Sequence, residues 1–246
     1  MKIDAYLTPL FTEKETQFDN SIVLMIDVMR ASTTICAALN NSAKEIIAID
    51  TVDKAVQLYS NLSRESRFIG GERNGVKPSG FDAGNSPDDY PEELVKGKTV
   101  IVTTTNGTPL FQKCKKAKAK VVAGFINHNA VLEHIEALIA ADPTITEVAV
   151  LCAGSDSRLA YEDTLCAGAY IDSIINRFTN VEITDTALAA KSLYQMHAAD
   201  LKEFIKTREH SQFLEKIGFS KDIDTCLEFN KFPVVPVITG NSIKKV

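Results

Sequence analysis

Short apolar runs alternate along the chain with longer segments of helical periodicity. The run at 22–26 predicts a buried strand, because no position in it offers a polar face to solvent. Similar runs predict strands near 2–7, 22–27, 45–50, 67–70, 98–104, 120–125, 146–152 and 233–238. Amphipathic or Ala-rich segments predict helices near 32–41, 52–61, 107–117, 128–141 and 160–178, with several more in 185–228.

This alternation of strands and helices predicts an α/β fold, with a mostly parallel or mixed sheet and helices on both faces. Residues 26–48 align without a gap with residues 101–123, as a weak internal repeat. The pattern therefore fits either a single α/β unit over 1–246 or two related subdomains, 1–95 and 96–246. Two prolines in the run near 233–238 favour an edge strand or an extended arm there.

Candidate chemistry begins where the strand at 22–27 ends. Asp27 ends this strand, Arg30 follows in the turn, and Ser32 and Thr33 come just before an Ala-rich helical segment. A helix start offers free N–H groups to an anion, and an Arg fork matches phosphate oxygens. We therefore expect Arg30 and the amides of Ser32 and Thr33 to hold a transferring phosphoryl group.

A long loop over 70–91 is rich in Gly, Pro and Asn and has almost no apolar periodicity. Loops of this length are uncommon inside a domain unless they are functional. The loop carries Glu72, Arg73 and Lys77, so it contributes one acid and two cations to the predicted site.

Two further strand ends supply polar residues, and in an open α/β sheet ligands bind beyond the carboxyl ends of the strands. We expect the Asn106-Gly107-Thr108 turn to hold the far end of a ligand, and Arg158 to add a cation. Mg²⁺ prefers a few carboxylates and completes its shell with water and substrate oxygens. The predicted metal ligands are Asp27, Glu72 and Asp163, and with Arg30 they form the predicted catalytic set. The expected substrate is a small anionic phosphate ester.

Two classes of alternative stay open, and the first is a different phosphohydrolase: one that acts on another small phosphate ester, or a cysteine phosphatase. Cys152 and Arg158 have the C-x₅-R spacing of cysteine phosphatases, directly after a strand, although Leu151 and Leu159 differ from the usual flanking residues. A non-catalytic sensor of an anionic metabolite is the second alternative, but such a sensor would gain nothing from carboxylates near its ligand.

Composition and charge limit which partners and which cellular compartment we expect for the protein. The formal net charge of −5 argues against a nucleic-acid binder that relies on phosphate contacts. The chain lacks the roughly 18-residue apolar run of a membrane span and the pattern of a signal peptide. Five widely spaced cysteines fit reduced thiols, so we expect a cytoplasmic protein. Base rates for small acidic α/β enzymes favour a homodimer.

The chain resembles the 2-phosphosulfolactate phosphatase family in four motifs that follow one another in order: I-D-V-M-R-A-S-T-T, G-G-E-R-N-G-V-K-P-S-G-F-D-A-G-N-S-P, T-V-I-V-T-T-T-N-G-T, and V-L-C-A-G followed by E-D-T-L-C-A-G. The resemblance implies a Mg²⁺-dependent acid phosphatase that hydrolyses 2-phospho-3-sulfolactate to 3-sulfolactate and phosphate. This reaction would be a step in the formation of sulfolactate and coenzyme M. It also implies an α/β fold distinct from those of the haloacid dehalogenases and the cysteine phosphatases.

Overall fold

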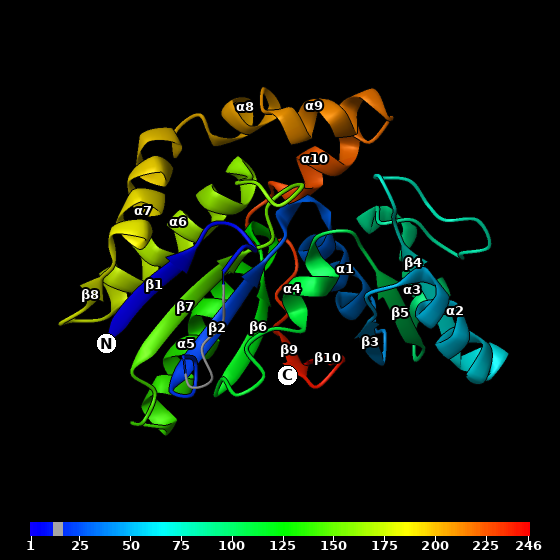
Figure 1. The fold of residues 1–246 in the computed structure, drawn as a ribbon, viewed down its shortest axis with the longest axis horizontal. Helices are drawn as coiled ribbons and strands as arrows, with labels where there is room; N and C mark the ends of the chain where they lie inside the picture. Colours follow the sequence, from blue (N-terminus) through cyan, green and yellow to red (C-terminus); the bar gives the residue numbers. More distant parts are fainter. Residues whose placement is uncertain (12–16) are drawn as a thin grey trace.

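One mixed sheet organises the computed structural model, which describes residues 1–11 and 17–246 (Figure 1). Within these residues ten strands lie in the order β4-β5-β3-β10-β9-β6-β2-β7-β1-β8. Their bounds are β1 Lys2–Tyr6, β2 Ser21–Ile26, β3 Glu45–Ala48, β4 Arg67–Gly71, β5 Thr99–Thr103, β6 Ala119–Ala123, β7 Glu147–Cys152, β8 Glu182–Ile183, β9 Pro236–Thr239 and β10 Ser242–Lys245. The expected α/β fold with a mixed, mostly parallel sheet is confirmed.

Helices follow most of the strands, as the sequence predicts. The α-helices are α1 Thr33–Asn40, α2 Val52–Asn61, α3 Glu92–Val95, α4 Gly107–Phe111, α5 His128–Ala141, α6 Tyr161–Arg177, α7 Asp185–His197, α8 Leu201–Lys206, α9 Glu209–Lys216 and α10 Ser220–Cys226. The helix expected over 107–117 ends early, because Cys114 adopts a left-handed backbone conformation with φ of 53°. None of the described helices has both the length and the apolar character that a membrane-spanning helix needs.

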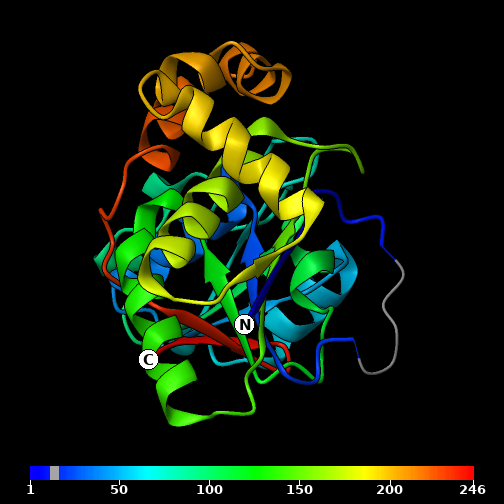
Figure 2. The same cartoon turned by 90° about the vertical axis from the view of Figure 1, so that its left-hand side faces the viewer.

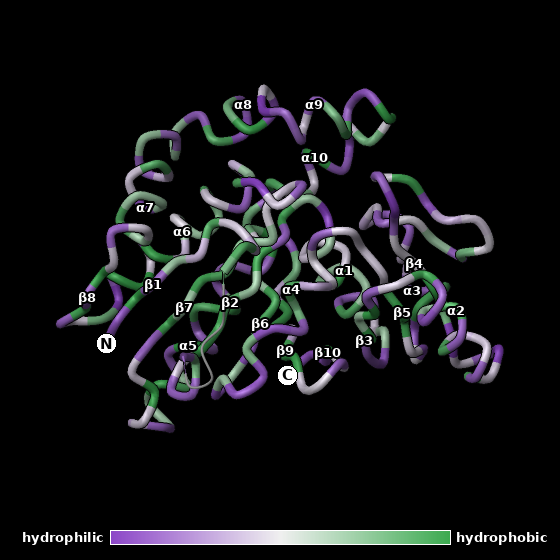
Figure 3. Tube along the Cα trace, in the orientation of Figure 1, coloured by the Kyte–Doolittle hydropathy of each residue, from purple (hydrophilic) through white to green (hydrophobic). Residues whose placement is uncertain are grey.

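Helices cover both faces of the sheet, and β2 shows how the residues divide between them. Ile22, Leu24 and Ile26 pack into a core that includes residues of α5, α6 and α7. Val23 and Met25 point the other way and pack with residues of α1 and α4. All five are buried because β2 is covered on both faces, which explains the unbroken apolar run. Figure 3 shows hydrophobic colours along the central strands β2, β6 and β7.

The C-terminal hairpin divides the sheet into two parallel sections. Strands β3, β4 and β5 are parallel to one another, and so are β1, β2, β6, β7 and β8. The antiparallel pair β9–β10 lies between them, with β9 on β6 and β10 on β3. Figure 1 shows β2, β6 and β7 on one side of this hairpin and β3, β4 and β5 on the other.

The expectation of an edge strand or extended arm near 233–238 is therefore wrong. Pro233 precedes β9 and Pro236 is its first residue, so neither interrupts the middle of the strand. The side chains of Ile238 and Ile243 are buried in the same core as Met25 and Val100, which come from the two parallel sections. The hairpin thus fills the space between the sections and joins them.

Candidate active site

A cavity of about 520 Å³ lies where the carboxyl ends of several strands meet. Loops that follow β2, β4, β5 and β7 form its walls, and α9 closes one side. Figures 1 and 2 show α8, α9 and α10 lying across this end of the sheet. The lining residues are Asp27, Met29, Arg30, Glu72, Asn74, Gly75, Asn85, Thr104, Thr105, Asn106, Ser155, Asp156, Glu209, His210, Phe213 and Leu214.

Sheet twist brings these loops together. The three antiparallel pairings at the hairpin make the two parallel sections run in opposite senses, so a flat sheet would place the ends of β2 and β5 at opposite edges. Twist of about 20–25° per strand accumulates over the steps between β2 and β5. The ends meet at Gly107, where a Cβ would lie 2.6 Å from Oδ2 of Asp27 and 2.9 Å from Cβ of Ala31. Only glycine permits this close approach.

Asp27 lies at the base of the cavity, directly after β2. The chain does not enter α1 at once but first forms a kinked π-helical turn, Val28–Ser32 (η1). Met29 has non-helical backbone angles there (φ −113°, ψ 88°), and the Met29–Arg30 peptide bond is cis. Oδ1 of Asp27 accepts a weak hydrogen bond from the Ala31 amide at 3.4 Å. Burial raises the pKa of Asp27 to about 7, and the nearby Glu72 carboxylate adds to the rise, whereas His210 lowers it. Asp27 is thus a carboxyl group that can exchange a proton near neutral pH.

Arg30 also lines the cavity, and protein groups fix its guanidinium in place. Nη1 donates to Oδ2 of Asp222 at 2.8 Å, and Nη2 donates to the Gly75 carbonyl at 2.7 Å. The guanidinium carbon lies 4.1 Å from the centre of the Phe219 ring. A guanidinium has five N–H donors, so these contacts orient Arg30 without using all of them.

Glu72 completes a pair of cavity carboxylates with Asp27. Its Oε1 accepts from the Thr105 amide at 2.6 Å, and its Oε2 accepts from the Gly75 amide at 2.8 Å. These bonds tie the loops after β4 and β5 together, and each oxygen keeps a further lone pair. Thr104, Thr105 and Asn106 continue the cavity wall beside it.

Asp163 is placed differently from the expectation that it would be a third metal ligand. Its Oδ1 accepts from the Val28 amide at 2.8 Å and its Oδ2 from the Gly154 amide at 2.9 Å. It does not belong to the cavity lining. Burial and neighbouring carboxylates, among them Glu162, raise its pKa well above the usual range. Asp163 therefore holds the loops after β2 and β7 in register beneath the cavity.

Ser32 and Thr33 also lie outside the cavity lining, and their backbone amides bond within the chain. The Ser32 amide donates to the Asp27 carbonyl at 2.8 Å, and the Thr33 amide donates to the Arg30 carbonyl. The π-helical turn thus consumes the N–H groups that we expected an anion to use. Likewise Thr108 is fully buried and hydrogen-bonds through its hydroxyl with Thr104.

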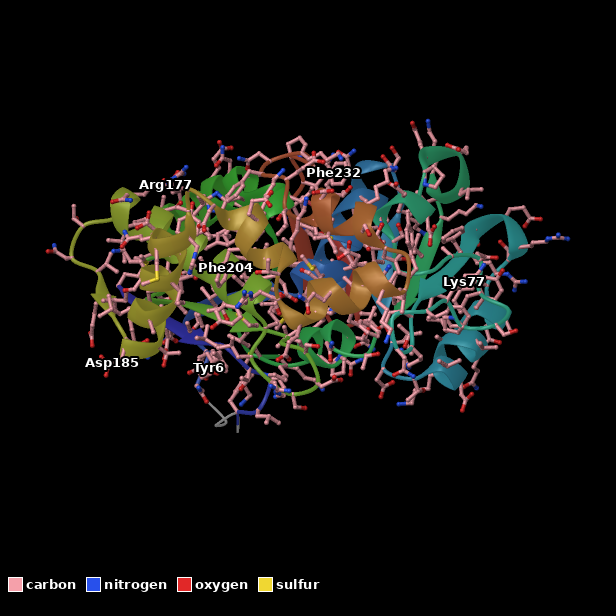
Figure 4. The ribbon with its side chains drawn as sticks, turned by 90° about the horizontal axis from the view of Figure 1, so that it is seen from above. Tyr6, Lys77, Arg177, Asp185, Phe204 and Phe232 are labelled. Atoms are coloured by element: carbon pink, nitrogen blue, oxygen red, sulfur yellow. The ribbon has the colours of Figure 1, made fainter. Side chains whose placement is uncertain are left out.

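The remaining predicted cations lie around the cavity and not in its lining. Arg73 donates to the Glu72 and Asp50 carbonyls and to the Thr103 hydroxyl, so it links the loop after β4 to the loop after β3 and to the end of β5. Lys77 is exposed, and Figure 4 shows it away from the helices at the centre of the view. The Arg158 side chain is 75% exposed and lies 3.8 Å from Glu209 in an adjoining hollow of about 280 Å³.

Cys152, the candidate nucleophile of the C-x₅-R spacing, is fully buried and is absent from the cavity lining. Its thiol contacts the Asp163 carbonyl oxygen at 3.5 Å. Burial raises the pKa of this thiol well above its usual range, and so do the neighbouring Asp163 and Cys166. A protonated, inaccessible thiol does not fit a phosphatase nucleophile.

Three residues of this region escape prediction from the sequence, Asn85, His210 and Asp222, and so does the pairing of Glu162 with His210. His210 and Asp222 come from helices far along the chain, in a region with no recognisable motif. His210 Nδ1 lies 2.5 Å from Oε1 of Glu162, and Asp222 pairs with Arg30. Asn85 lies in the long loop that we predicted to be functional, but its side-chain type alone gives no signal.

The oxygen donors of the cavity fit Mg²⁺. Among the described residues no three His, Cys, Asp or Glu side chains come close enough to form a metal site by themselves. Mg²⁺ commonly binds through one or two carboxylates plus substrate oxygens, and Asp27 and Glu72 provide two. Oδ1 of Asn85 is buried without a hydrogen-bond partner in the described chain and belongs to a lining residue, which adds a neutral oxygen donor.

Comparisons with known proteins identify the family of the chain. A family model described as 2-phosphosulpholactate phosphatase matches residues 6–241. A protein of Caldanaerobacter subterraneus subsp. tengcongensis is 35% identical over 222 residues, 90% of this chain and 89% of that protein. A Clostridium acetobutylicum protein is 33% identical over 243 residues, 99% of this chain and all of its own length. A Caldicellulosiruptor saccharolyticus protein is 39% identical over 210 residues, 85% of each chain. All three bear the name probable 2-phosphosulfolactate phosphatase. The chain belongs to the 2-phosphosulfolactate phosphatase family.

Proposed function

We propose that this protein is a Mg²⁺-dependent phosphatase that hydrolyses 2-phospho-3-sulfolactate to 3-sulfolactate and phosphate. One observation carries the proposal: the carboxylates of Asp27 and Glu72 line the same cavity as Arg30, in a chain that matches the family over nearly its whole length. Such a substrate is a polyanion with phosphate, sulfonate and carboxylate groups. It therefore needs both cationic donors and a means of offsetting the negative charge of the cavity.

Asp27 and Glu72 would hold Mg²⁺, with Asn85 as a neutral donor. The bound ion would neutralise charge on the phosphoryl oxygens, which phosphoryl transfer requires. Arg30 holds the transferring group through donors that Asp222 and Gly75 leave free, and these two partners fix the direction of the guanidinium. Asn106, at the start of α4, faces the other end of the substrate. Phe213 and Leu214 supply apolar surface that excludes water from one wall.

The alternatives find less support in the site. Chemistry through Cys152 would need a reactive thiolate in contact with the ligand, whereas this thiol is buried and protonated. A plain anion sensor would gain nothing from two carboxylates in its cavity. A phosphohydrolase of another small phosphate ester would need the same carboxylates and cationic donors as the proposed enzyme. Only a comparison of substrates distinguishes the two.

The proposal is tested by phosphate release from 2-phosphosulfolactate and a panel of other phosphate esters, with Mg²⁺ or with excess chelator. We expect turnover that requires Mg²⁺ and is greatest on 2-phosphosulfolactate. Glu72→Gln should lower kcat by about 10²–10³-fold, in the range of losing one charge-stabilising group. Glu92→Gln, which removes an exposed carboxylate of α3, is the matched control and should leave kcat unchanged.

Cys152→Ser should retain turnover. Turnover that ignores chelator and is lost in Cys152→Ser would transfer the chemistry to the cysteine. Thermal stabilisation by 2-phosphosulfolactate without any phosphate release would favour the sensor. Preference for a different ester would keep the phosphatase and change its substrate.

A further inference from the structure

His210 and Glu162 form a carboxylate–imidazole pair at the edge of the cavity. His210 lies in the first turn of α9 and Glu162 in the first turn of α6. Nδ1 of His210 contacts Oε1 of Glu162 at 2.5 Å. The Glu162 side chain is only 2% exposed and the His210 side chain 16%. His210 nevertheless belongs to the cavity lining, together with Asp27 and Arg30.

The contact with Glu162 decides which ring nitrogen is available to a ligand. Because Nδ1 is engaged, Nε2 is the nitrogen that can meet a molecule in the cavity, and it has no hydrogen-bond partner in the described chain. Oε2 of Glu162 is also buried without a partner there, so the carboxylate has no competing contact that would turn it away from the ring. A carboxylate on one nitrogen fixes the orientation of an imidazole and stabilises its charged form.

The charges around His210 favour the protonated ring. Burial lowers its pKa, but the Glu162 carboxylate, through the hydrogen bond and its charge, and the Asp27 carboxylate outweigh this and raise the pKa above the usual value; Arg30 opposes them weakly. The other titratable groups that line the cavity are Glu72, Asp156 and Glu209, all acidic. His210 also lines the adjoining hollow, which contains Arg158 and Arg208.

We propose that His210 is the general acid of this site, which protonates the leaving oxygen of the phosphate ester through Nε2, and that Glu162 is its positioning residue. The inference rests on the proposed phosphatase function and names a catalytic group that the family motifs do not contain. Hydrolysis of an alkyl phosphate needs such a group, because an alkoxide is a poor leaving group unless it is protonated as it departs.

The proton and electron balance is complete without another reactant. The bond between phosphorus and the ester oxygen breaks, and its electron pair stays on that oxygen, which takes the Nε2 proton of His210 and becomes the product hydroxyl. Water forms the new bond to phosphorus. One of its protons then passes to Nε2 of the neutral His210, which restores the imidazolium, and hydrogen phosphate leaves.

A comparison of leaving groups tests the role of His210. In the full chain with Mg²⁺, His210→Ala should lower kcat on 2-phosphosulfolactate by about 10²–10⁴-fold. It should have much less effect on p-nitrophenyl phosphate, because a nitrophenolate leaves without a proton. Added imidazole should restore part of the lost turnover, which it could not do for a misfolded variant.

His197 offers a matched control. It also pairs with a carboxylate, since its Nδ1 lies 3.3 Å from Oδ1 of Asp200, but it stacks on Phe204 outside the cavity lining. His197→Ala should leave both activities at the wild-type level. Glu162→Gln should move the alkaline limb of the kcat–pH profile to lower pH, a shift that a purely structural role for Glu162 would not produce.

The outcomes separate this inference from the proposed function. If His210→Ala turned over 2-phosphosulfolactate at the wild-type rate, the general-acid role alone would be overturned. An equal loss on both esters with no rescue by imidazole, or an alkaline limb that stays in place in Glu162→Gln, would have the same consequence. Wild-type protein that releases phosphate from neither ester would overturn the proposed function and, with it, this inference.

Discussion

At the scale of single residues, Asp27 connects the stability of the protein to its chemistry. The carboxyl group lies at the end of β2, and burial together with the nearby Glu72 raises its pKa to about 7. Keeping such a group near a cavity costs folding energy whenever it is ionised. The charge of His210 offsets part of that cost in the protein itself. A bound cation would offset more of it, so the ionised group is most destabilising when no cation is bound.

Replacing Asp27 by Asn should remove this cost. Between the ordinary pKa near 4 and about 7, the native state binds more protons than the unfolded state, so wild-type stability should fall as the pH rises through this window. With chelator present at pH 8, Asp27→Asn should be more stable than wild type, by on the order of 2–4 kcal/mol. Near pH 4 the two should be alike. Urea denaturation across this pH range measures the difference.

Asp53→Asn, which removes an exposed carboxylate in the first turn of α2, is the control and should follow the wild-type curve. If Asp27→Asn showed the wild-type dependence on pH, the raised pKa of Asp27 would be contradicted.

At the scale of elements, the C-terminal hairpin is the part of the fold that sequence patterns describe least well. Strand β10 has only one apolar residue, Ile243, and three polar ones, as an exposed segment would, yet it lies between β9 and β3. Ile243 is fully buried opposite Ile46 and Ile238, whereas Val246, just beyond the strand, is 66% exposed. The side chains of Ile243 and Val246 should therefore contribute very differently to the free energy of unfolding.

Ile243→Ala should destabilise the protein by about 2–5 kcal/mol, because the lost side-chain atoms leave a cavity in a core shared by both sheet sections. Val246→Ala should change the free energy of unfolding by no more than about 0.5 kcal/mol. Urea denaturation of both variants measures this contrast. Equal small effects would mean that the hairpin is not packed in the sheet as described.

At the scale of the whole molecule, the two parallel sections share a core and not only a connection. Val23 and Met25 of β2 pack in the same cluster as Val100 and Val102 of β5, with the hairpin residues between them. The cavity likewise takes residues from both sections. Neither the core nor the site would survive the separation of the sections.

We therefore predict one cooperative unfolding transition and not separate transitions for 1–95 and 96–246. Native-state hydrogen exchange in increasing denaturant measures this directly. The amides of Leu24 in β2 and Ile101 in β5 should lose protection at the same denaturant concentration. Each section contains strands from both 1–95 and 96–246. Earlier loss of protection throughout one of these two ranges would instead support two subdomains.

The sequence by itself predicted most of the local elements and several of the residues that line the cavity. Unbroken apolar runs predicted the strands because both faces of the sheet are covered, and Thr51, whose hydroxyl accepts from the Lys54 amide, marks the start of the predicted helix at 52–61. Asp27, Arg30, Glu72 and Asn106 were predicted as site residues because they lie in the turns that follow strands, and all four line the cavity.

Only the tertiary structure decided the rest, because the remaining contacts join residues that are distant in sequence. The Arg30 partner Asp222 and the His210 partner Glu162 lie far along the chain from them, and no local pattern encodes such pairs. The amides of Ser32 and Thr33 bond within the π-helical turn. Asp163 lies outside the cavity lining, where its oxygens accept from two loop amides. Strand order, the hairpin between the sections and the twist that brings β2 and β5 together depend on global packing, which a local sequence pattern does not specify.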